Sequence, residues 1–180
     1  MQKQKKSQAW YMDFILGFTI FVLFTFITIH YLTDEYILPR EESDSVLAAT
    51  RHISDSLVSS GSPDNWTSDN VVRIGLTNGN HVINETKLES FLNLTTENYI
   101  STRAMLGTRF DYLVFFKDKF NNTLNLTGLG SLYYGKPGLS EESVLLLNPD
   151  TLYSIERNLV LKKGENNTAQ IIIMHVYVWQ

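Results

Sequence analysis

The feature that most constrains this chain is a run of nearly unbroken apolar residues close to its N-terminus, FILGFTIFVLFTFITIHYL at 14–32. As a helix rising about 1.5 Å per residue, the run is roughly 30 Å long, which matches the hydrocarbon core of a bilayer. It contains no acidic residue, Lys or Arg. A helix with no polar face has to lie in lipid or against other apolar helices. We therefore predict that 14–32 spans a membrane.

The flanks of the run predict its orientation. Lys3, Lys5 and Lys6 precede it, whereas the segment TDEYILPREESD that follows is acidic. Lys and Arg stay on the cytoplasmic side during insertion, so we expect a single-pass protein with a cytoplasmic N-terminus and an extracellular remainder. Aromatic residues that suit the two membrane interfaces bracket the run at Trp10, Tyr11, Tyr31 and Tyr36.

The length of the run bears on whether it is removed. A secretory signal peptide has an apolar region of about 7–15 residues followed by a small-x-small cleavage site. Here the run is longer, and the residues after it are Thr33, Asp34, Glu35 and Tyr36. An uncleaved anchor explains both the length and the charges.

The junction before the run fits a further interpretation. Lys5-Lys6-Ser7-Gln8-Ala9-Trp10 places basic residues, one small residue and Gln directly ahead of the apolar helix. This junction resembles the class III signal peptide of archaeal type IV pilin-like proteins. The resemblance implies that a prepilin peptidase cuts between Ser7 and Gln8 and leaves the helix on the mature protein. It also implies partnership with other pilin-like subunits in a surface filament.

The same resemblance implies roles for residues in the helix. Many pilins carry an acid at the fifth mature position, where it pairs with a neighbouring subunit's N-terminus. Counted from Gln8 that position is Met12, and the acid stands one residue later at Asp13. A carboxylate near a helix start is also favoured by the helix dipole alone, so both explanations of Asp13 stay open. The residues that we assign to the assembly helix are Asp13, Phe14, Gly17, Phe21 and Phe24.

The rest of the chain predicts one folded domain of the α+β class. About 145 residues follow the run, enough for one domain with its own core. The chain has no cysteine, so an external domain has to be stabilised by burial without disulfides. We divide the chain into a cytoplasmic leader at 1–7, an apolar helix at 8–38 that breaks near Pro39, and an extracellular pilin-like domain at 39–180.

Apolar spacing predicts a second helix after Pro39, in which Val46, Ile53 and Leu57 share a face and Gly61 terminates the helix. Gly61-x-Pro63-x-x-Trp66 then leads to a strand at 71–76, a tight turn and a returning strand at 81–83. This helix, Trp and Ile-Gly-Leu pattern again resembles the outer domains of archaeal pilin-like proteins. Read without the family, it is a helix-to-strand connection with a buried Trp.

Further elements complete the predicted domain. Asn84 caps a helix at 85–92, and Thr95 or Thr96 caps another at 97–106. Strands are expected at 110–116 and 124–126, with a weaker one at 131–134. Ser140-Glu141-Glu142-Ser143 opens a short irregular or helical connection to 145–147. The C-terminus predicts a hairpin of 153–161 and 169–179, whose second strand is rich in β-branched and aromatic residues and is expected to be central.

Six sites have the form Asn-x-Ser/Thr, and their density supports an external domain that can carry N-linked glycans. They are Asn65, Asn84, Asn93, Asn121, Asn125 and Asn166.

The chain shows no pattern typical of an enzyme. It has no Gly-rich phosphate loop and no nucleophile elbow, and its four His, at 30, 52, 81 and 175, have no metal-ligand spacing. Lys and Arg are scattered, so nothing indicates nucleic-acid binding. We expect no catalytic residue, metal or cofactor, with His52 solvated and His175 packed in a strand.

Two functions remain open. In the first, the chain is a type IV pilin-like subunit, major or minor, that is trimmed at Gln8 and assembled through its apolar helix. In the second, it is an uncleaved single-pass membrane protein that presents an extracellular binding domain.

Overall fold

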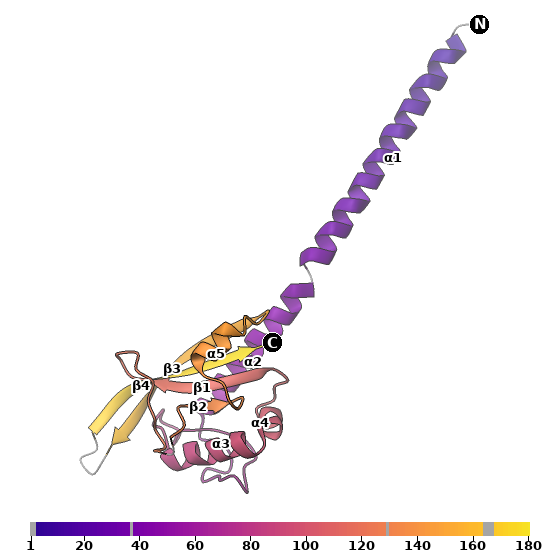
Figure 1. The fold of residues 1–180 in the computed structure, drawn as a ribbon. Coiled ribbons are helices and arrows are strands. Elements are labelled where there is room, and N and C mark those ends of the chain that lie inside the picture. The colour runs from indigo at the N-terminus through magenta and orange to yellow at the C-terminus, as the bar shows by residue number, and fades with distance from the viewer. Residues whose placement is uncertain (1–2, 37, 129, 164–167) are drawn as a thin grey trace. The chain divides into compact units, whose positions relative to one another are not determined.

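The computed structural model describes residues 3–36, 38–128, 130–163 and 168–180, and the side chains of 11–31, 42–128, 130–162 and 168–180. The chain separates into two compact units, Met1–Ser43 and Asp44–Gln180. We call them the N-terminal unit and the folded unit. Figure 1 shows the elements of both, and each unit is described by itself.

The N-terminal unit consists of α1, Lys3–Tyr36, and the first residues of α2, Leu38–Val58. Pro39 lies in the first turn of α2, where a missing backbone N–H costs no intrahelical hydrogen bond. The sequence predicted a break near Pro39, and in the structure one helix ends at Tyr36 and the next begins at Leu38.

The folded unit contains a four-stranded antiparallel sheet in the order β2-β1-β4-β3. The strands are β1, Asp111–Lys117; β2, Tyr133–Gly135; β3, Leu152–Lys163; and β4, Thr168–Trp179. The predicted hairpin and its central second strand are confirmed, because β4 pairs with both β1 and β3. Together with the helices, this sheet confirms the α+β class.

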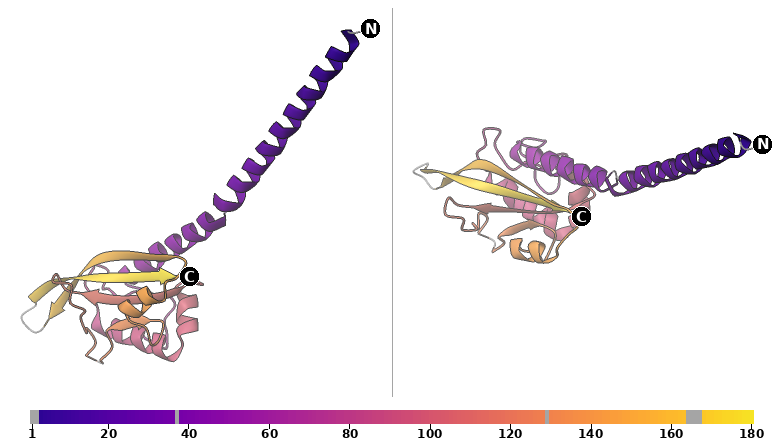
Figure 2. Two further views of the ribbon diagram at one scale, coloured as in Figure 1. Left: turned by 45° about the horizontal axis from the view of Figure 1, so that its top comes forward. Right: turned by 90° about the horizontal axis from the view of Figure 1, so that it is seen from above.

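Two apolar cores lie on the two faces of the sheet. Alternate residues of β1 divide between them: Tyr112, Val114 and Phe116 join the larger core, and Leu113 and Phe115 join the smaller. The larger core is covered by α2 and by α3, Glu85–Glu97, whereas α5, Glu141–Leu146, covers the smaller core through Val144. Figure 2 shows α5 on one side of the sheet and α2 on the other.

The helix starts follow from capping side chains. Asn84 accepts a hydrogen bond from the backbone N–H of Lys87 and caps α3, as predicted. The next helix, α4, Tyr99–Met105, is capped by Asn98 and not by Thr95 or Thr96, so that prediction was wrong. Both threonines lie inside α3, where their hydroxyls bond to the carbonyl of Leu92. Ser140 caps α5.

The predicted strands at 71–76, 81–83 and 124–126 were wrong. These segments make only isolated bridges, such as Thr77 with Ile83 and Lys117 with Thr123. Their backbone groups bond elsewhere: Leu76 N–H donates to Leu57 O at the end of α2, and Leu124 N–H donates to Phe116 O. The segment at 71–76 is therefore a packed connection beneath α2.

Trp66 anchors this connection in the larger core. Its side chain is buried, and its indole N–H donates to Gly75 O at 2.8 Å. A Cβ at Gly75 would lie 2.3 Å from Gly61 N, and Gly61 has a φ of +78° and lies against the indole. Packing therefore explains the pattern of Gly61, Trp66 and Gly75, because two backbone segments approach each other closely around the Trp66 ring.

Candidate functional site: the apolar helix and the surfaces of the folded unit

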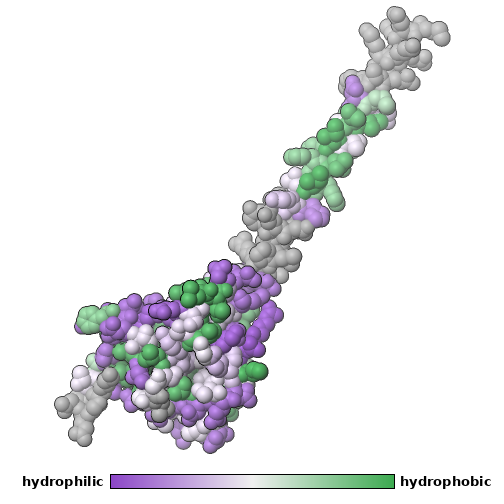
Figure 3. Space-filling model, in the orientation of Figure 1, coloured by the Kyte–Doolittle hydropathy of each residue, from purple (hydrophilic) through white to green (hydrophobic). Residues whose placement is uncertain are grey.

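Over residues 14–29, α1 carries apolar side chains on every side. Tyr11–Tyr31 has a mean hydropathy of 2.2 and is long and apolar enough to cross a membrane. None of its residues is buried inside the structure, and its large apolar side chains are all exposed. Figure 3 shows this surface as a green band. Because burial of each such side chain is worth about 1.5–3 kcal/mol, leaving them all in water costs on the order of tens of kcal/mol.

The threonines of α1 do not interrupt this apolar surface. The hydroxyls of Thr19, Thr25 and Thr28 each donate to the carbonyl four residues earlier, at 2.8–2.9 Å. In lipid, a polar group has to be satisfied inside its own segment or by a neighbouring helix. The three hydroxyls are therefore satisfied within α1 and add no unpaired donor to its surface.

The predicted assembly residues lie on one face of α1. At 100° per residue, Asp13, Phe14, Gly17, Phe21 and Phe24 all fall within about a third of the circumference. Gly17 has no side chain, and a Cβ built on it meets no atom within 4 Å, so the helix surface is open at this position. Ser7 and Gln8 lie in α1, but their side chains are outside the described ones.

The opposite face of α1 carries a hollow of about 330 Å³. Phe18, Val22 and Phe26 form one ridge beside it at four-residue spacing, and Thr19 and Leu23 form the other. Grooves between such ridges are where a neighbouring helix packs its own side chains. None of the residues that line this hollow is among the predicted assembly residues.

The candidate glycosylation sites fall in different settings. Asn65, Asn93, Asn121 and Asn125 are exposed. Asn84 is half-buried, and its amide nitrogen, the atom that carries a glycan, donates to Asn78 Oδ1 at 2.9 Å. Asn166 lies outside the described residues. A glycan at Asn84 would therefore be attached to a half-buried nitrogen that already donates a hydrogen bond beside the α3 cap.

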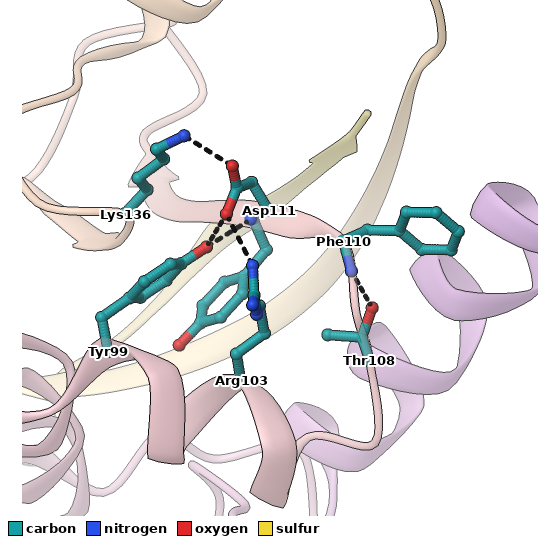
Figure 4. Close-up of polar contacts among 7 residues, drawn as sticks. Tyr99, Arg103, Thr108, Phe110, Asp111 and Lys136 are labelled. Atoms are coloured by element: carbon teal, nitrogen blue, oxygen red, sulfur yellow. Dashed lines mark hydrogen bonds and ion pairs between the residues drawn. The ribbon is translucent and has the colours of Figure 1, made fainter.

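A polar cluster centred on Asp111 joins three elements of the folded unit (Figure 4). Asp111 begins β1 and accepts hydrogen bonds from the Tyr99 hydroxyl at 3.0 Å, from Arg103 at 3.2 Å and from Lys136. The Tyr99 hydroxyl also accepts the backbone N–H of Tyr112 at 3.1 Å. No sequence pattern indicates this cluster, because its members are far apart in the chain and share no motif.

The electrostatics of the cluster indicate a structural tie. Burial raises the pKa of the Asp111 carboxyl, but hydrogen bonds from Lys136 and Tyr99 and the charges of Lys136 and Arg103 outweigh it, and the pKa lies below its ordinary value. Burial raises the pKa of Tyr99. A carboxylate with both oxygens occupied is a poor general base, and its role here is to fix α4 and the segment after β2 against β1.

A second polar cluster holds α5 on the smaller core. Lys117 is almost fully buried and pairs with Glu141 at 2.8 Å, and the Tyr177 hydroxyl donates to the same carboxylate at 3.3 Å. Burial, and the Glu141 charge, raise the pKa of Tyr177 to about 12. His175 packs within its strand, as predicted: it is buried and stacked on Phe115 at 4.9 Å, and burial lowers its pKa.

Little else in the described residues points to chemistry. Within them, no three His, Asp or Glu side chains are arranged so that they could hold a metal ion. His52 is exposed, as predicted. A groove of about 380 Å³ lies beside the edge strand β2, lined by the end of α3 and by residues 130–139 on either side of the strand.

Comparison of the chain with protein-family models, with curated proteins and with solved structures gives no match in any of the three.

Proposed function

We propose that this protein is a structural subunit, major or minor, of an archaeal type IV pilus-like surface filament. The N-terminal helix is held in the membrane before assembly and in the filament core after it. A prepilin peptidase removes residues 1–7, and the folded unit faces the outside. This proposal goes beyond the fold and combines the Ser7-Gln8 junction with the surface of α1.

The observation that carries the proposal is that α1 is apolar on all sides and has two distinct packing faces. A simple membrane anchor needs only an apolar surface. A helix in a filament core touches neighbours on more than one side, and this requires features that another helix can fit. Gly17, where a neighbouring backbone can approach closely, and the hollow lined by Phe18, Val22 and Phe26 are candidates for such features on opposite faces.

The experiment that tests the proposal is the intact mass and N-terminal sequence of the protein from native membranes and from sheared surface material. A mature chain that begins at Gln8 supports it, and filament imaging follows. Intact Met1 or Gln2 with no shorter form contradicts it. A Ser7→Pro variant is the matched control, since it should block the cut and leave membrane insertion unchanged.

The second candidate function is a single-pass membrane protein with an external binding domain, and the groove beside β2 favours it. Sites that take small ligands are concave and lie where elements meet. Disulfide cross-linking separates the two functions, because the natural chain has no cysteine. Gly17→Cys should give cross-linked dimers in membranes if α1 helices pack together. A lone anchor should give no more dimer than the surface control Phe120→Cys.

A further inference from the structure

The five Asn-x-Ser/Thr sites that the structure describes differ in whether a sugar-transferring enzyme can reach them in the folded unit. Such an enzyme has to reach two groups, the Asn amide nitrogen that takes the sugar and the hydroxyl two residues later. The attached sugar is bulky and needs open solvent around it. A usable site therefore has both groups accessible and unbonded, in a segment outside a regular helix or strand.

Two sites on α3 do not meet this requirement. Asn84 is half-buried, and both polar atoms of its side chain are bonded: the nitrogen donates to Asn78, and the oxygen caps α3. Asn93 is exposed but lies inside α3, and the hydroxyl residue of its site, Thr95, is buried and donates to Leu92 O at 2.9 Å. A transferase would have to unwind the helix to reach that hydroxyl.

Two further sites lie in connections whose polar groups are occupied. In the Asn65 site, the N–H and the hydroxyl of Thr67 both donate to Asn70 Oδ1, at 2.7 and 3.3 Å. In the Asn125 site, the side-chain oxygen of Asn125 accepts a backbone N–H at 3.1 Å, and the hydroxyl residue Thr127 is buried. Each of these sites has one of its two groups bonded or covered.

The fifth site, Asn121-Asn122-Thr123, meets the requirement. Asn121 is exposed and lies in the turn after β1 with a φ of +68°, a conformation that Asn tolerates better than most residues. Neither the Asn121 amide nor the Thr123 hydroxyl makes a hydrogen bond with any residue that the structure describes. The neighbouring Phe120 is 72% exposed, so the tip of the turn faces water.

The turn keeps its shape without the Asn121 side chain. The Asp118 carboxylate accepts the N–H groups of Phe120 and Asn122 at 2.8 and 2.9 Å, and the Asn122 side-chain amide at 3.0 Å. The backbone N–H of Asn121 donates to Asp118 O, and that of Asp118 donates to Asn122 O, both at 3.0 Å. These bonds leave the Asn121 amide free to carry a substituent.

We propose that Asn121 is the one of the five described sites that carries an N-linked sugar, and that the Thr123 hydroxyl is what the transferring enzyme recognises. The donor is a sugar chain held on a lipid phosphate. The Asn121 amide nitrogen bonds to the anomeric carbon while the bond from that carbon to the phosphate oxygen breaks. The phosphate leaves with the bonding electrons, and the proton lost by the nitrogen goes to a base of the enzyme. The inference rests on the proposed function for the external location of the folded unit.

The test is mass spectrometry of peptides from the full chain, purified from its native membranes. Fragment spectra that retain the sugar should place it on Asn121 and leave the other four described sites bare. Asn121→Gln and Thr123→Val should each abolish the sugar mass, because each removes one of the two required groups. Asn125→Gln is the matched control, four residues further along the same loop, and should leave the sugar mass unchanged.

A folding measurement accompanies the variants. Asn121→Gln should unfold at the same temperature as wild-type chain made without sugar, since the Asn121 side chain makes no bond with the described residues. Sugar on any of the other four sites with Asn121 bare would overturn the proposal. A chain with no sugar at any described site would overturn it as well, and sugar that persists in Thr123→Val would overturn the role of that hydroxyl.

Failure of this inference is distinguishable from failure of the proposed function. If the chain begins at Gln8 and Gly17→Cys cross-links, but Asn121 is bare, the pilin-like function stands and the assignment of the sugar is wrong. If Asn121 carries the sugar while residues 1–7 remain and α1 does not cross-link, the folded unit is external and glycosylated, and the pilin-like function is wrong.

Discussion

Both α1 and α2 are long helices, but the apolar residues of α2 are buried in a core, whereas those of α1 are exposed. In α2, Val46, Ile53 and Leu57 are fully buried, while other positions such as Arg51 and Asp55 face water. In α1, residues 11–31 are apolar around the whole circumference and none is buried. A helix with one apolar stripe makes a core with its own chain, whereas a helix that is apolar all round needs lipid or other chains.

The largest expected effect breaks the apolar surface of α1. Phe21→Arg with Phe24→Arg places two charges near the middle of the helix, at a cost of about 2.5–3.5 kcal/mol each for membrane insertion. We expect the carbonate-resistant membrane fraction to fall sharply. Thermal unfolding of the folded unit should be unchanged, and Phe120→Arg should leave both quantities as they were. Full membrane retention of the double variant would contradict a membrane-spanning α1.

The next largest effect is expected from a substitution in the core of the folded unit that does not change α1. Trp66→Ala removes a buried ring and its hydrogen bond to Gly75 O, and should lower the free energy of unfolding by about 3–5 kcal/mol. Urea unfolding followed by circular dichroism measures this loss, with the exposed Phe120→Ala as the control. Membrane retention should not change. A loss below 1 kcal/mol would show that the indole does not anchor the connection at 61–76.

A smaller effect depends on pH. In the folded unit the pKa of Asp111 lies below its ordinary value. Its ion pairs therefore stabilise the folded unit at pH values above the unfolded pKa of about 4. That stabilisation is lost as the pH falls through the lower folded pKa. Asp111→Asn should therefore destabilise by about 1–3 kcal/mol at pH 7. The difference from wild type should shrink on acidification below pH 4. A difference that is constant from pH 7 to pH 2 would rule out the charge as its cause.

The smallest expected effect is the difference in stability between two tyrosine substitutions in the same region. The buried Tyr112 hydroxyl makes no hydrogen bond with the described residues, whereas the Tyr99 hydroxyl bonds to both Asp111 and Tyr112 N–H. Tyr112→Phe should leave stability unchanged or raise it by up to about 1 kcal/mol, and Tyr99→Phe should lower it by about 1–2 kcal/mol. Chemical unfolding of the two variants side by side measures this. Equal losses would indicate a buried partner for Tyr112.

The sequence predicted those parts of the fold that depend on local pattern. The apolar helix, the face of α2, the Asn84 cap and the central β4 follow from hydrophobic period and capping chemistry, which act within a few residues. The segment at 71–76 has strand-like composition, but its backbone bonds to the end of α2. Composition describes what a segment can pair with, and only the tertiary arrangement decides its partner.

The candidate site was predictable to a similar degree. The residues on the Gly17 face of α1 follow from helical spacing, and the same count could have indicated the opposite hollow. The Asp111 cluster was not predictable, because its four side chains come from α4, β1 and the residue after β2. The exposed leucines at 145–147 are visible in the sequence as three leucines that follow a capped acidic turn. Their exposure, however, depends on which helix face Val144 occupies.

The sheet order has a consequence for how the protein is made. The central strand β4 follows every other described element along the chain, so β1 and β3 have no shared partner until it has been synthesised. A sheet that depends on such distant pairing forms late and slowly. If the folded unit is exported, as we propose, its sheet can close only after residues 168–179 have been synthesised. A stop codon before residue 168 should leave an anchored but unfolded tail, open to the cell's quality-control proteases.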